Sequence, residues 1–131
     1  MSDLHKLAKR AVACKDWRWM PGMLASDAGG NQHRVIEHDA GREYITTMLR
    51  DYNDAHCESS ARALDVTPDL DDPATLGCLL ALVREAWEVE RAVVWWNEHD
   101  QGWVADVRPR NVVFVRDSEA HALVAALEAA P

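Results

Sequence analysis

Hydrophobic residues recur in this chain at two spacings, one typical of helices and one typical of strands. In residues 2–15 the apolar side chains from Leu4 to Val12 fall on one helical face, and Ser2 can cap that helix. A second helix begins after Asp117 or Ser118 and turns its alanines, leucines and valine inward up to Leu127. The pattern therefore predicts a helix near each end of the chain.

A third helix is predicted in the middle of the chain, after an acidic loop. Asp72 suits the N-cap position, and Pro73 suits the first helical position because its missing N–H would have no partner there. The following residues are so apolar that the helix must be buried on more than one side. Gly77 costs about 1 kcal/mol relative to alanine within a helix, so we expect a close neighbour there. The inner stripe is formed by Leu76, Leu79, Leu80, Val83 and Trp87.

Between the helices, β-branched and aromatic residues bounded by turn residues predict short strands. The strands are expected near 17–24, 33–38, 42–48, 91–96, 103–108 and 112–115. Residues 49–67 are polar, and we expect a mobile loop or insert there, with one short helix near 59–64.

Short turns between successive strands favour antiparallel pairing. The predicted order is α-β-β-β-α-β-β-β-α, an α+β fold with three helices in a helix–sheet–helix sandwich. At 131 residues the chain is expected to form one domain, residues 1–131.

The net charge of −8 is distributed unevenly. Residues 1–36 carry a net +3, and residues 37–72 carry a net −7. An acidic chain is a poor non-specific ligand for nucleic acid, because that binding depends on neutralising phosphates. The three cysteines form no disulfide framework, and no apolar run is long enough for a membrane span. With a polar start, these features favour a cytoplasmic protein; Cys14 and Cys78 are expected to be small core residues.

Three segments resemble small uncharacterised proteins of phages and prophages. They are residues 17–23 (WRWMPGM), residues 72–87 (DPATLGCLLALVREAW) and residues 120–128 (AHALVAALE). The layout is similar to that of the phage α/β/α-sandwich domain proteins. The resemblance implies a shared fold and a phage setting, and it brings no catalytic residues.

Side chains capable of catalysis or metal binding are present without the spacing that such sites need. His33, His38, His56, Cys57 and Cys14 do not form the close ligand pairs typical of zinc sites. Cys57 with His56 or His38 lacks an orienting third group, so an incidental cysteine is favoured. The acids Glu88, Glu90, Glu98, Asp100 and Asp106 are explained by turns and strand edges on an acidic surface. We therefore expect no enzyme activity, no cofactor and no metal site.

The six tryptophans are the stronger functional signal. Trp87 lies on the stripe of the central helix and is expected in the core. Trp95 and Trp96 are consecutive in a strand, so they face opposite sides of its sheet. A sandwich that covers both sheet faces would bury both, whereas an incomplete cover would leave one exposed as a binding anchor.

The leading hypothesis is a non-enzymatic, phage-encoded interaction protein that inhibits a host defence complex, in the manner of an anti-CRISPR protein. Its acidic surface would occupy a basic groove that otherwise holds nucleic acid. The expected partner-binding residues are Glu37, Asp39, Glu43, Asp51, Asp54 and Glu58, with Trp96 and Trp103 as anchors.

Two alternatives remain open from the sequence. One is a small-molecule or nucleotide-binding protein that uses a tryptophan with Arg108, Arg110 or Arg116. The other is DNA contact through the basic first helix, with Lys6, Lys9, Arg10, Lys15 and Arg18. A homodimer is among the partners that the sequence leaves open.

Overall fold

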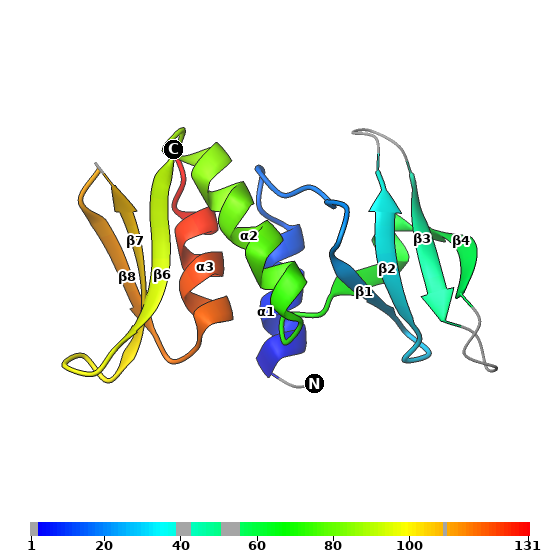
Figure 1. Cartoon of the computed structure of the whole chain (residues 1–131), viewed down its shortest axis with the longest axis horizontal. Helices are drawn as coiled ribbons and strands as arrows, with labels where there is room; N and C mark the ends of the chain where they lie inside the picture. Colours follow the sequence, from blue (N-terminus) through cyan, green and yellow to red (C-terminus); the bar gives the residue numbers. More distant parts are fainter. Residues whose placement is uncertain (1–2, 39–42, 51–55, 109) are drawn as a thin grey trace.

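One layer of three helices lies between two antiparallel sheets (Figure 1). This arrangement comes from a computed structural model, which describes residues 3–38, 43–50, 56–108 and 110–131. The α+β class with three helices and antiparallel sheets is confirmed, and strands follow both α1 (Asp3–Val12) and α2 (Pro73–Ala86) as predicted. Five strands lie between α1 and α2 in the chain, and the layer of helices is enclosed by the two sheets.

The first sheet has the order β4-β3-β2-β1-β5. Its strands are β1 (Leu24–Asp27), β2 (Gln32–Glu37), β3 (Tyr44–Arg50), β4 (His56–Arg62) and β5 (Val66–Pro68). Every pairing in it is antiparallel. Ala25, Val35 and Ile45 point into the core and are almost completely buried. On each strand, the residues next to these in sequence point to the opposite face of the sheet, because side chains alternate along a strand.

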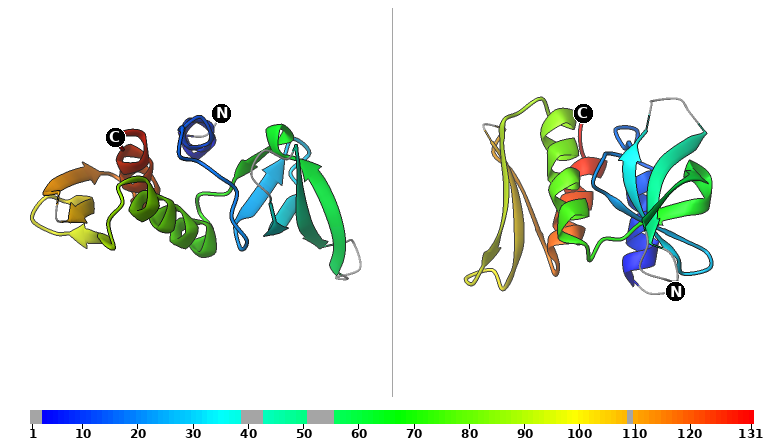
Figure 2. Two further views of the ribbon diagram at one scale, coloured as in Figure 1. Left: turned by 90° about the horizontal axis from the view of Figure 1, so that it is seen from above. Right: turned by 45° about the vertical axis from the view of Figure 1, so that its right-hand side comes forward.

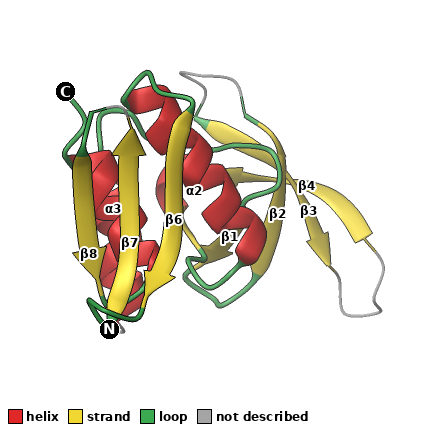
Figure 3. Cartoon of the chain, turned by 60° about the vertical axis from the view of Figure 1, so that its left-hand side comes forward, coloured by secondary structure: helices red, strands yellow, loops and turns green. Residues whose placement is uncertain are grey.

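The second sheet is a meander of β6 (Arg91–Asn97), β7 (Gly102–Arg108) and β8 (Val112–Arg116). Figure 3 shows α2 and α3 (Glu119–Glu128) behind this sheet, with no element of the described chain in front of it. Ala92, Ala105 and Val107 face these helices and are buried in the core. The sheet is therefore covered on one face only.

The helix layer is densely packed because each helix contacts at least two other elements. Helix α3 contacts all three strands of the meander as well as α1 and α2, and its residues 122–127 are all buried. Helix α1 contacts β5 and α3, and seen from above it lies alongside them (Figure 2). Arg10 of α1 also forms a two-pronged ion pair with Glu128 of α3, at 2.6 and 3.2 Å.

Two predicted elements are wrong. Residues 17–20 form no strand: they are irregular, the chain turns at residues 21–22, where Gly22 has a φ of +97°, and the first strand begins at Leu24. Trp17 and Trp19 meet edge to face instead, with ring centroids 5.4 Å apart.

The helix predicted near 59–64 is a strand up to Arg62, followed by a 3₁₀ turn at Ala63–Asp65. The polar residues of β4 satisfy their backbone groups by pairing along the whole of β3, so the segment expected to be a loop belongs to the sheet. The expected mobility of 51–55 lies outside the described residues.

The start of α2 joins the helix layer to the first sheet. Asp72 caps the helix, as predicted, by accepting from the backbone N–H of Thr75 at 2.9 Å. Its carboxylate also accepts from Arg34 of β2 at 2.7 and 3.2 Å. The Thr75 hydroxyl donates to Asp72 and accepts from the backbone N–H of Leu24 at the start of β1. One carboxylate therefore connects α2 to two strands.

The central helix differs from the prediction at Gly77. That residue is exposed, and a Cβ added there would meet no atom within 4 Å. The close neighbour expected from the sequence is absent among the described residues. Cys14 and Cys78 are half-buried against the core rather than fully inside it, and burial raises the pKa of both thiols. No helix within the described ranges is long and apolar enough to cross a bilayer.

Substituting Asp72 tests the junction at the start of α2. Asp72→Ala removes both the cap and the partner of Arg34, and we expect it to lower the free energy of unfolding by about 2 kcal/mol. Asp72→Asn keeps a good capping residue and should cost less. The Arg34 hydrogen bonds lower the pKa of the Asp72 carboxyl below its usual 3.8.

Because this pKa is lowered in the folded protein, the carboxylate stabilises the fold above pH 3.8 and loses that effect as pH falls through the folded pKa. Urea titrations should therefore show the gap between wild type and Asp72→Asn closing under acid. Equal stability of all three proteins at pH 7 would contradict the assigned role.

Gly77→Ala should stabilise the protein by about 0.5–1 kcal/mol, because alanine favours the helix and meets open space. Gly102→Ala is the matched control. There an added Cβ would lie 3.0 Å from both the Arg116 carbonyl oxygen and a Val115 methyl, so we expect destabilisation. Thermal unfolding followed by circular dichroism measures both, and a lower melting temperature for Gly77→Ala would count against the packing described here.

Candidate functional site

The face of the β6–β8 meander that points away from the helices is the largest cluster of exposed apolar side chains among the described residues. Val93 lies opposite Asp106, which lies opposite Val113; Trp95, Val104 and Val115 form the adjacent row. Eight large hydrophobic side chains are exposed in the described chain, and four of them belong to these two rows. We call this surface the open face; its residues are Val93, Trp95, Val104, Asp106, Val113 and Val115.

The open face spans all three strands. Val93, Trp95, Val113 and Val115 are 41, 37, 52 and 38% exposed. Val104 is on the central strand β7, between Trp95 and Val115, and is only 2% exposed. It does not belong to the core that packs against the helices. Its neighbours on the sheet cover it. The result is one surface with exposed apolar side chains on β6 and β8 and the buried side chains of Val104 and Asp106 between them.

Two arginines mark one end of this surface. Arg91 and Arg108 are directly opposite each other in the β6–β7 pairing, one step beyond the Val93–Asp106 row. Asp106 is 5% exposed and accepts from Nε of Arg108 at 2.8 Å. The buried carboxylate is thus paired, as burial of a charge requires.

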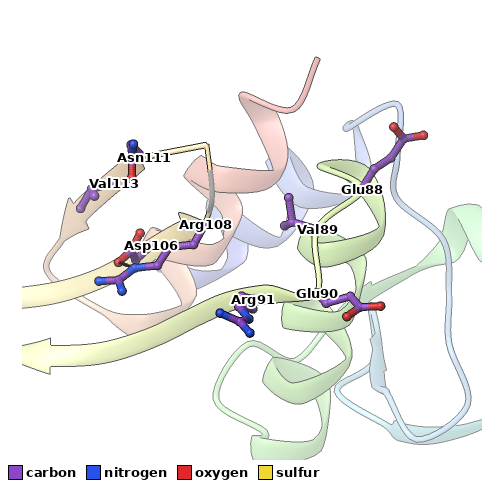
Figure 4. Close-up of a pocket in the computed structure, with 8 residues that line it drawn as sticks. All are labelled: Glu88, Val89, Glu90, Arg91, Asp106, Arg108, Asn111 and Val113. Atoms are coloured by element: carbon purple, nitrogen blue, oxygen red, sulfur yellow. Dashed lines mark hydrogen bonds and ion pairs between the residues drawn. The ribbon is translucent and has the colours of Figure 1, made fainter.

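A hollow of about 800 Å³ lies at this arginine end (Figure 4). Its residues come from β6, from β7, from the start of β8 and from the two turns at this end of the sheet. Glu88 and Asn111, one in each turn, have φ values of 54° and 55°. Asparagine adopts this conformation readily, whereas for glutamate it is strained.

The turn at Glu88 is fixed by the end of α2. The N–H of Val89 donates to the Arg84 carbonyl and that of Glu88 to the Glu85 carbonyl, the hydrogen-bond pattern of a Schellman cap. Val89 is consequently buried, and the chain enters β6 directly at Arg91. Helix termination therefore positions one wall of the hollow.

The structure separates the partner-binding residues that the sequence suggested. Glu37 and Glu58 share the solvent side of the first sheet, in adjacent rows with Thr46 and Met48. Glu43 precedes β3 and pairs with Arg62 at 2.8 Å. Asp39, Asp51 and Asp54 lie outside the described residues. The tryptophan anchors lie in the other sheet, on the far side of the helix layer (Figure 1).

Trp96 and Trp103 do contact each other. They are opposite in the β6–β7 pairing, and their rings meet edge to face with centroids 6.0 Å apart. They lie on the helix-facing side, at the hairpin end of the sheet. Trp96 is nonetheless 45% exposed, so an arrangement that buries both Trp95 and Trp96 is wrong. Trp87 is in the core, as predicted, and donates to the Ala126 carbonyl.

Trp95 was missed as a site residue. Strand alternation predicts that Val93 and Trp95 share one face of the sheet. Which face stays uncovered depends on the packing of α2 and α3, which the sequence does not show. Val113 and Val115 carry the same alternation in β8. Arg91, Arg108 and Asp106 meet only because of the strand register.

His33, one of the metal ligands considered from the sequence, is engaged in other contacts. His33 is buried and held between Thr47 and Asp27, with its Nε2 3.0 Å from an Asp27 oxygen. Hydrogen bonds from His33 and Asn31 lower the pKa of Asp27 to about 2. Within the described part of the chain, no three His, Cys, Asp or Glu side chains are grouped to hold a metal ion.

The basic first helix is partly neutralised. Arg10 pairs with Glu128, and Arg18, which follows the helix, pairs with Glu85 at 2.7 Å. Of the arginines considered for nucleotide binding, Arg108 lines the hollow, whereas Arg110 and Arg116 do not.

Comparisons with protein-family models, with curated proteins and with solved structures find no match for this chain.

Proposed function

We propose that this is a non-enzymatic interaction protein that binds a different protein through the open face. The observation that carries the proposal is the uncovered apolar strip on β6–β8. Contiguous apolar patches on a protein surface mark interaction sites far more often than singly exposed side chains do. Val93 and Val113 lie on either side of Asp106, and Trp95 and Val115 lie on either side of Val104, so the exposed apolar side chains gather on one face of the sheet.

The chemistry of the strip suits a protein contact. A partly exposed tryptophan can supply a large contact area at little cost in conformational entropy, and tryptophan is enriched among the residues that dominate binding energy. The filled centre at Val104 gives a firm surface, so little ordering is needed on binding. The arginine end adds a polar rim on one side.

Val113→Glu tests the open face, and Leu64→Glu is the matched control. Leu64 is 81% exposed on the 3₁₀ turn that follows β4, so Leu64→Glu also replaces an exposed apolar side chain by glutamate, on another surface. Tagged wild type, Val113→Glu and Leu64→Glu would each be used to capture partners from a lysate of the native host, with quantitative mass spectrometry. We expect one protein, stoichiometric with wild type and Leu64→Glu, to fall at least about tenfold with Val113→Glu.

Thermal unfolding of the three proteins must match, so that a lost partner reflects the surface and not misfolding. Retention of the same partner by Val113→Glu would contradict the proposal. The proposal would also be contradicted if wild type sedimented as a dimer and the Val113→Glu variant as a monomer. The open face would then bind a second copy of this chain.

A second candidate is the inhibitor of a host defence complex that the sequence suggested, with the acidic side of the first sheet in a basic nucleic-acid groove. The observation that favours it is the shared solvent side of Glu37 and Glu58, in a protein of net charge −8. An acidic surface placed against a basic groove accelerates association and excludes phosphate. The phage setting belongs to this candidate.

Charge reversal distinguishes the second candidate. The captured partner would be loaded with fluorescent DNA or RNA, and release would be followed by anisotropy. Wild type should release the nucleic acid, and Glu37→Lys with Glu58→Lys should not. The control, Glu98→Lys with Asp117→Lys, makes the same charge change at exposed positions just after β6 and β8 and should act as wild type. Release that is unaffected by the first pair would rule out this mode.

A further inference from the structure

Two like charges face each other at the end of the open face. Arg91 and Arg108 are directly paired across β6 and β7, on the side of the sheet that the helices do not cover. Like charges in this position destabilise a sheet. A bound anion between them would turn the repulsion into attraction, so this pairing points to a ligand.

Arg108 is held in place through one nitrogen of its guanidinium. Its Nε donates to Asp106 at 2.8 Å, and the carboxylate is itself buried within the sheet surface. The side chain of Arg108 remains 64% exposed, so its terminal nitrogens face solvent. Asp106 therefore orients Arg108 and leaves two nitrogens for another acceptor.

The side chain of Arg91 forms no hydrogen bond or ion pair with the other described residues. Its guanidinium lies on the same side of the strands as that of Arg108, and the carboxylates of Glu88 and Glu90 point away from both (Figure 4). Val89 and Val113 line the hollow beside the arginines. The hollow thus combines Arg108, which Asp106 orients, and Arg91 with a wall of two valines.

We propose that Arg91 and Arg108 form a binding site for an oxyanion, a carboxylate or a phosphate group, in the hollow at the end of the open face. Two guanidinium groups on one side of a sheet can each donate two N–H groups to such an anion. The Asn111 side chain, on the same rim, can donate a further hydrogen bond. The site does not depend on the proposed protein interaction, because anion binding is measured on the protein alone. The two surfaces are adjacent and share Asp106 and Val113.

The experiment is an NMR titration of the ¹⁵N-labelled protein with inorganic phosphate and, separately, with acetate. Sodium chloride at matched ionic strength gives the baseline. We expect saturable shifts of the amides of Arg91, Arg108, Asn111 and Val113 and of the arginine Nε–H groups. Tighter binding of phosphate would identify a phosphorylated ligand, and tighter binding of acetate a carboxylate such as an acidic side chain.

Arg91→Gln should weaken the binding of the better anion about tenfold or more, since it removes a charged hydrogen-bond donor. Arg110→Gln is the matched control: it loses the same charge two residues from Arg108, and it does not line the hollow. Without anion, Arg91→Gln should unfold at the same temperature as wild type or a higher one, because a repulsion is removed.

Three outcomes would overturn the proposal. The first is shifts that are linear and equal to those with chloride. The second is equal weakening by Arg91→Gln and Arg110→Gln, which would show general charge attraction. The third is a lower melting temperature of anion-free Arg91→Gln, which would give Arg91 a structural role. Failure of the protein-binding proposal would appear in the Val113→Glu capture experiment and would leave these readouts unchanged.

Discussion

A single layer of helices has to cover two sheets, and the rest of the structure follows from that constraint. Helix α3 is buried along most of its length because it packs on the meander and on both other helices. No described helix is left to cover the outer side of either sheet (Figure 2). The outward rows of β3 and β4 hold one tyrosine among threonine, serine, methionine, glutamate and arginine, whereas those of the meander hold three valines and a tryptophan that are exposed. The difference in composition, and not the architecture alone, makes the open face a candidate site.

The helix layer depends on the way α2 begins. Asp72 satisfies the first turn of the helix and at the same time accepts from Arg34 of β2, while Thr75 reaches the start of β1. These contacts join residues that lie 38 and 51 positions apart in the chain. A charged, half-buried junction of this kind fixes the position of α2 more specifically than apolar packing would, because its geometry has few alternatives. The other end of α2, at Glu88, sets the direction of β6 and so the position of Arg91.

Local signals predicted the elements that carry their own start and stop residues. Asp72 and Pro73 define α2, and Ser118 caps α3 as expected. β4 could not be predicted, because its polar residues have no alternating pattern and are ordered by backbone pairing with β3. The alternation of Trp17 and Trp19 predicted a strand, but the two rings form an edge-to-face pair in an irregular segment. The candidate site could be predicted only in part. Alternation groups Val93 with Trp95, but the uncovered face follows from tertiary packing and the Arg91–Arg108 pairing follows from strand register.

The account of function rests on the claim that the β6–β8 face is uncovered in the free protein. Solvent paramagnetic relaxation of valine methyl groups, with a neutral gadolinium chelate, measures this directly. The methyls of Val93, Val113 and Val115 should relax strongly, whereas those of Val107 and Val83, which are completely buried, should barely respond. Equal protection of both groups would show that another part of the chain, or a second copy, covers the face, and it would contradict the account.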